Sequence, residues 1–170
     1  MLPPWARYGL VLFTGLVLQV AFFSELRLHG VSANVMLLLA IAAGLAGGPE
    51  RGALVGFAAG LCIDLVLPAA VSPLGMSALT FCIVGFVVGK IQTTIIRSAW
   101  WIPMLVTAAA SAVGVVLYAL IGEVLGRNTL GVSNFGVIVG VVALFNGILS
   151  PLAIRCVTWA EHTDPRLRAV

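Results

Sequence analysis

Six long apolar runs make up most of the chain, and short polar stretches separate them. A helix needs about 20 apolar residues to cross the roughly 30 Å of hydrocarbon in a bilayer. The pattern therefore predicts an all-α polytopic membrane protein, a compact bundle forming a single integral membrane domain over residues 1–170. The six transmembrane helices are expected at about 8–23, 33–46, 52–67, 74–90, 101–125 and 135–157.

The second and third runs are short for a transmembrane helix. Counted inclusively, 33–46 holds 14 residues and 52–67 holds 16 residues, which at about 1.5 Å per residue gives roughly 21 and 24 Å. A single re-entrant hairpin would instead place Glu50 and Arg51 deep in the hydrocarbon, at a cost of several kcal/mol. Two short transmembrane helices are therefore the better prediction.

The composition supports this class of protein. Hydrophobic residues make up 61% of the chain and charged residues 9%, and the mean hydropathy is +1.16. Such a balance excludes an ordinary water-soluble fold.

The positive charges predict the orientation in the membrane. With the N-terminus inside, only Arg27 and Arg127 fall on the outer side. The other seven of the nine Lys and Arg residues fall inside, at Arg7, Arg51, Lys90, Arg97, Arg155, Arg166 and Arg168. This bias predicts cytoplasmic termini, and the net charge of +3 reflects it rather than a nucleic-acid partner. All four tryptophans also fall at the inner interface, as the amphipathic ring favours; they are Trp5, Trp100, Trp101 and Trp159.

The sequence contains little that is suited to catalysis. It has no phosphate loop, no nucleophile motif and no His-rich metal helix, so we expect no enzyme, no metal and no cofactor. Cys62, Cys82 and Cys156 are odd in number and lie in or beside apolar runs, where they are expected to be small core residues. Transport and the binding of other membrane proteins remain as function classes.

A stripe of small residues marks the third run. Gly52, Gly56, Gly60 and Asp64 recur every four residues and so share one face of a helix. In lipid, small residues at this spacing let two helices approach closely. Asp64 would face the packed helix, where three interpretations stay open: a hydrogen bond or cap on a neighbouring helix, a proton or solute role, or a contact with a partner protein.

Similar pairs of small residues occur in the later runs, at Gly85 and Gly89, Ala110 and Gly114, and Gly136 and Gly140. Such pairs are common in helical membrane bundles and predict close helix packing.

The region from Gly52 to Lys90 resembles the rod shape-determining protein MreD family. The resemblance lies in the order of glycines, an aspartate that ends a helix, and a Leu-Gly turn that opens the next helix. In this chain the motif is Gly56, Gly60, Asp64, Pro73-Leu74-Gly75, Ser77-Ala78 and Gly85-x-x-x-Gly89. Members often have a Pro-Asp pair at the start of the second helix, where this chain has Ala33-Asn34.

The resemblance implies a non-enzymatic scaffold of the bacterial cell-elongation machinery in the cytoplasmic (inner) membrane. Such proteins bind the bitopic protein MreC and link MreB filaments indirectly to RodA and a class B penicillin-binding protein, which insert sidewall peptidoglycan. The expected helix-packing or partner-binding residues are Gly52, Gly56, Gly60, Asp64, Pro73, Gly75, Gly85 and Gly89.

A second resemblance leads to a different function. A glycine-rich helix that ends in Asp is also similar to the substrate-binding S components of energy-coupling factor vitamin transporters, which have six helices. A vitamin site needs convergent polar or aromatic side chains near the outer surface. The polar residues available on the outer side are Glu25, Arg27, His29, Asp64, Arg127 and Asn128, with few aromatic residues beside them.

Overall fold

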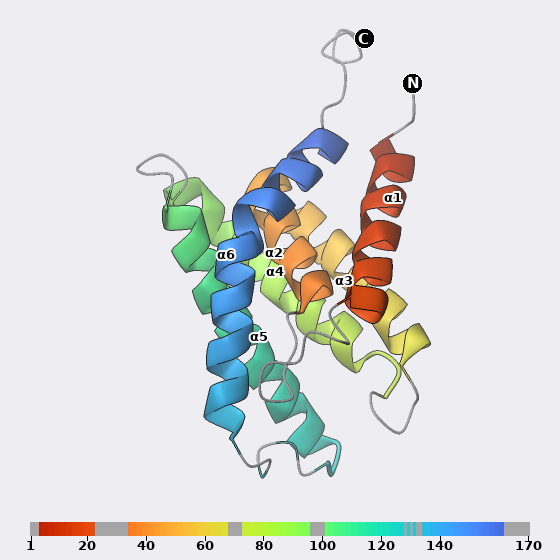
Figure 1. Cartoon of the computed structure of the whole chain (residues 1–170), viewed down its shortest axis with the longest axis vertical. Coiled ribbons are helices and arrows are strands. Elements are labelled where there is room, and N and C mark those ends of the chain that lie inside the picture. The colour runs from red at the N-terminus through yellow and green to blue at the C-terminus, as the bar shows by residue number, and fades with distance from the viewer. Residues whose placement is uncertain are drawn as a thin grey trace, which may run out of the picture.

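In a computed structural model, the part of the chain that is described comprises residues 4–22, 34–67, 73–95, 101–127, 129, 131 and 134–161. These residues form six α-helices and no β-strand (Figure 1). The helices are α1 (Pro4–Val17), α2 (Val35–Gly47), α3 (Pro49–Val66), α4 (Met76–Ile95), α5 (Ile102–Val124) and α6 (Phe135–Glu161), and a π-helical turn (Leu18–Phe22) continues α1. The all-α prediction is confirmed.

Each observed helix overlaps one predicted range, but α3 is longer than expected. It has 18 residues and begins at Pro49, so Glu50 and Arg51 lie in its first turn. Gly48 has a φ of 83°, which glycine adopts without strain, and it turns the chain sharply after α2. Pro49 can then start α3 at once because its φ already suits a helix. α3 therefore starts three residues before the predicted start at 52, and with 18 residues it is still shorter than the about 20 residues of a full crossing. α2 has only 13 residues.

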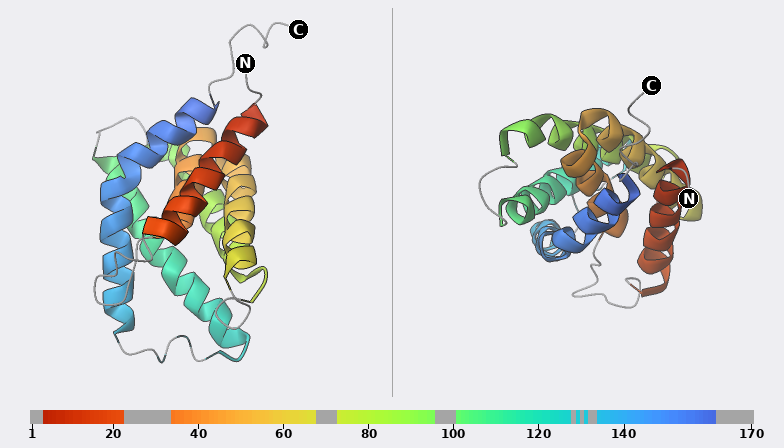
Figure 2. Two further views of the ribbon diagram at one scale, coloured as in Figure 1. Left: turned by 45° about the vertical axis from the view of Figure 1, so that its right-hand side comes forward. Right: turned by 90° about the horizontal axis from the view of Figure 1, so that it is seen from above.

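α2 is the central helix of the bundle. It contacts each of the other five helices, and its residues from Val35 to Leu45 are all buried. Figure 2 shows its orange ribbon surrounded by the other helices. A helix that is hydrophobic on all sides is expected in the interior, and α2 accordingly supplies most of the core.

The outer faces of the bundle are apolar. On α6, Leu144, Ile148 and Leu152 follow one another at four-residue intervals and are 64%, 61% and 62% exposed. Two helices, α5 with 23 residues and α6 with 27, are long and apolar enough to cross a membrane. Large exposed apolar faces of this kind suit lipid rather than water.

The start of α1 and the end of α6 lie at the same end of the bundle (Figures 1 and 2), which we call the terminal end. Arg51 in the first turn of α3 binds Glu161 there, and Gly89 near the end of α4 packs on Pro49. Several residues used to predict the orientation lie outside the described residues, namely Arg27, Arg97, Arg166, Arg168 and Trp100.

The most extensive contact between two helices joins α3 to α4, and it brings their backbones together. A Cβ atom added to Gly52, Gly56 or Gly60 would collide with backbone atoms of α4. A Cβ atom on Gly85 or Gly89 would likewise collide with backbone atoms at the start of α3. We call these five glycines the α3–α4 seam. In lipid this close packing takes the place of a hydrophobic driving force.

We predict that Gly56→Leu and Gly60→Leu each lower the stability of the folded chain by about 1–3 kcal/mol, because the added side chain forces two backbones apart. The matched control is Gly140→Leu on α6, where a Cβ atom meets nothing within 4 Å. Thermal unfolding in detergent should show a lower midpoint for both seam variants and little change for the control. Equal midpoints for all three variants would contradict the packing described here.

Candidate functional site

Asp64 caps the N-terminus of α4. It is only 3% exposed, and its Oδ2 atom accepts hydrogen bonds from the backbone N–H groups of Gly75 at 2.9 Å, Ser77 at 3.1 Å and Ala78 at 3.3 Å. The first N–H groups of a helix have no partner within the helix, and a carboxylate there is also favoured by the helix dipole. Asp64 thus ties the end of α3 to the start of α4.

Pro73 and Gly75 complete the same turn. The Pro73 carbonyl oxygen accepts a hydrogen bond from the Met76 N–H at 3.2 Å. Gly75 has a φ of 97°, a conformation in which a side chain would be strained. Both residues therefore set the direction in which α4 leaves the turn.

The structure brings all eight predicted site residues to one place, the interface of α3 and α4. The seam glycines are buried between the two helices, so a partner would reach them only if the helices separated. Of the three interpretations of Asp64, the hydrogen bonds favour the cap. Binding of a partner by these residues stays a prediction.

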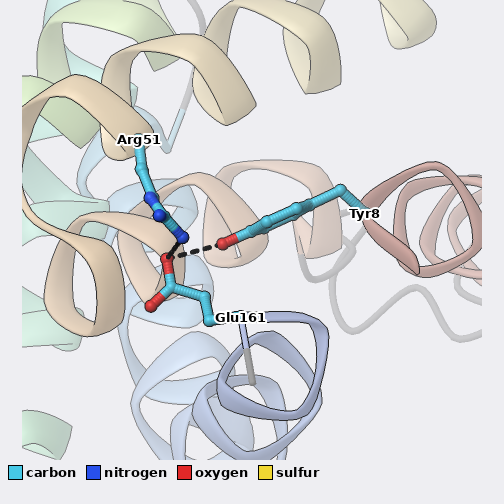
Figure 3. A network of polar contacts seen from close by, with 3 residues as sticks. All are labelled: Tyr8, Arg51 and Glu161. Atoms are coloured by element: carbon cyan, nitrogen blue, oxygen red, sulfur yellow. Dashed lines mark hydrogen bonds and ion pairs between the residues drawn. The ribbon is translucent and has the colours of Figure 1, made fainter. Parts of the chain in front are cut away.

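A polar network joins three helices at the terminal end (Figure 3). The Tyr8 hydroxyl on α1 donates a hydrogen bond to Glu161 Oε1 on α6 at 2.6 Å. Arg51 Nη1 on α3 donates to the same oxygen at 3.0 Å and forms an ion pair with it.

Sequence patterns alone do not predict this network, because Tyr8 and Glu161 are 153 positions apart. The only available signal was the predicted orientation, which places the start of the chain, Arg51 and the polar tail on one side. Arg7 adds a contact at the same end, where its guanidinium lies 5.6 Å from the centre of the Trp159 ring. Polar contacts therefore hold the start of α1 against the end of α6.

A second group of polar side chains lies in the core between α2, α5 and α6. Asn146 is fully buried, and its Nδ2 atom donates to Ser111 Oγ at 3.0 Å and to the Asn34 carbonyl oxygen at 3.3 Å. Asn146 Oδ1 and Ser150 Oγ have no hydrogen-bond partner among the described residues. Polar contacts of this kind fix how membrane helices rotate against one another. In the sequence, the feature that points to this group is Asn146, the single Asn within the last apolar run.

The described residues contain no group of three or more His, Cys, Asp or Glu side chains that could hold a metal ion. Cys62 and Cys82 are half-buried and Cys156 is exposed, and all three are free thiols. His29 and His162 lie outside the described residues. Among the described polar side chains, Asp64, Glu161 and Asn146 each join different helices.

We predict that Asp64→Ala lowers the stability by about 1–3 kcal/mol, because it leaves buried N–H groups without an acceptor. Asp64→Asn should retain most of the stability, since its carbonyl oxygen can still accept from the first turn of α4. Thermal unfolding of both variants beside the unchanged chain measures the difference. Wild-type stability of Asp64→Ala would rule out the capping role.

Comparison with known proteins shows the family of this chain. A family model described as rod shape-determining protein MreD matches residues 2–152 of the 170 residues. No curated protein and no solved structure matches the chain. The match extends from the N-terminus into α6 and includes the α3–α4 seam, Asp64 and the turn at Pro73 and Gly75. The chain therefore belongs to the MreD family of rod shape-determining proteins.

Proposed function

We propose that this chain is a non-enzymatic scaffold that acts in rod shape determination as a multi-pass protein of the bacterial cytoplasmic (inner) membrane. The observation that carries the proposal is the match to the MreD family over residues 2–152. Membership of this family gives a role in cell shape.

Six transmembrane segments agree with the arrangement of the helices. The start of α1 and the end of α6 share the terminal end, as an even number of crossings requires. Arg51 and Glu161 meet there, and Arg7 and Trp159 meet beside them. By the positive-inside rule the terminal end is the cytoplasmic end.

The proposed partner is an MreC-like bitopic membrane protein. Through it the chain would act with RodA and a class B penicillin-binding protein, and indirectly with MreB, so that sidewall peptidoglycan synthesis follows cell shape. The outer face of α6 supports docking of a partner helix. Gly136 and Gly140 are exposed there, a Cβ atom on either would meet no atom within 4 Å, and a pair of glycines at this spacing permits close approach of another helix.

The vitamin-transport alternative has less support. A cavity of about 410 Å³ is lined almost wholly by apolar side chains, whereas a vitamin site needs several convergent polar groups. The family match also concerns a shape-determining family rather than a transporter.

We predict that both termini and the start of α3 face the cytoplasm. Single cysteines at Ala6, Glu50 and Thr163, in a chain whose three native cysteines are replaced by Ser, should resist a membrane-impermeant thiol reagent added to intact spheroplasts. Ser133→Cys, in the predicted loop between α5 and α6, is the control and should react. Labelling of Glu50→Cys from outside would refute the six-segment topology.

We also predict that the tagged chain, purified from its native membrane, retains an MreC-like bitopic protein, and that depletion gives round or swollen cells in a rod-shaped host. Gly140→Leu should reduce the amount of copurified partner while leaving the thermal midpoint unchanged, because it blocks an outer face without disturbing the core. Normal cell shape together with a defect in vitamin uptake would overturn the scaffold and favour the transporter.

A further inference from the structure

An apolar groove of about 410 Å³ runs between α1, α2 and α6. Leu10 and Leu18 line it from the first helix and its π-helical extension, Leu39 from α2 and Leu152 from α6. Its volume lies within the range of about 300–1,000 Å³ that is typical of small-molecule sites. The groove is therefore large enough for a ligand, and its walls suit a hydrocarbon.

The length of the groove matches one leaflet of a bilayer. Its lining on α6 extends from Leu149 to Trp159, a stretch of helix that rises roughly 15 Å along its axis. This is about half of the roughly 30 Å of hydrocarbon that a transmembrane helix must cross. An acyl chain of a single lipid fits this length, whereas a transmembrane helix of a partner would extend well beyond the groove.

The groove has a cationic side chain in the half nearer the terminal end. Arg155 lines it and is exposed, and its guanidinium has no hydrogen-bond or ion-pair partner among the described residues. Trp159 lines the same end, with Arg7 over its ring at 5.6 Å. Glu161, the acidic group nearby, is already bound by Arg51 and Tyr8. An arginine close to hydrocarbon needs an anionic partner or access to the interface, and its planar guanidinium suits a phosphate in particular.

We propose that this groove binds one anionic phospholipid, with an acyl chain along the apolar walls and the headgroup phosphate on Arg155. The apolar walls suit an acyl chain, and Arg155, nearer the terminal end, suits a phosphate. Basic pockets between transmembrane helices on the cytoplasmic side bind anionic headgroups in the same way. The inference rests on the proposed placement in the membrane, and it does not require that the chain bind MreC.

Native mass spectrometry of the purified full-length chain tests the proposal, with phosphatidylglycerol and phosphatidylethanolamine as probes. We expect one phosphatidylglycerol to be retained in preference to phosphatidylethanolamine. Arg155→Gln should weaken retention of phosphatidylglycerol about fivefold, the effect expected of one cation at a membrane surface. Lys90→Gln is the matched control, because it removes an exposed cation near the terminal end that does not line the groove, and it should retain the lipid.

A second variant tests the apolar part of the groove. Thr14 lines the groove and is exposed, so Thr14→Phe should fill the space and reduce retention of both lipids. Equal retention of the two lipids by the unchanged chain, or equal losses in Arg155→Gln and Lys90→Gln, would overturn the proposal. A dimer that Thr14→Phe abolishes would also overturn it and assign the groove to a second copy of the chain. Because the chain is tested alone, a failure to copurify MreC would affect only the proposed function.

Discussion

The close approach of the backbones of α2, α3 and α4 near the terminal end of the bundle determines much of the remaining structure. A Cβ atom on Gly44 of α2 would lie 2.5 Å from the Gly85 carbonyl oxygen, and Gly52 and Gly85 exclude side chains from each other's positions. From this crossing the α3–α4 seam continues through Gly56 and Gly60 towards Asp64 and the start of α4. In the opposite direction it continues to Gly89. One packing constraint thus sets the register of α3 against α4 along their whole contact.

α1 is held in a different way from the seam helices. It makes far fewer contacts with the bundle, and at the terminal end it depends on Tyr8 and Arg7, which bind Glu161 and Trp159 of α6. Arg51, whose side chain is 47% exposed, adds an ion pair of a kind that contributes little to stability. Because no seam of small residues draws α1 against α6, an apolar groove remains between them.

The residues that carry the family resemblance are mainly residues of internal packing. Gly56, Gly60 and Asp64 face α4, and Gly75 shapes the turn before it. The motif therefore specifies how α3 and α4 pack, and the exposed apolar side chains of helices such as α6 lie outside it. Proteins that share a fold can carry different functional surfaces, so residues that specify the fold need not specify the partner.

The sequence by itself determined the helical class, the approximate helix positions and the importance of the glycines. Long apolar runs have few alternatives to helices, and spacing by four places glycines on one face. It did not determine the start of α3. The polar residues Glu50 and Arg51 suggested a loop up to residue 51, but Gly48 and Pro49 let the helix begin at Pro49. The helix that packs on the glycines, the three donors that Asp64 accepts from, and the meeting of Tyr8 with Arg51 and Glu161 were decided only by the tertiary structure. These contacts join residues far apart in the chain, and local pattern carries no information about which distant helices become neighbours.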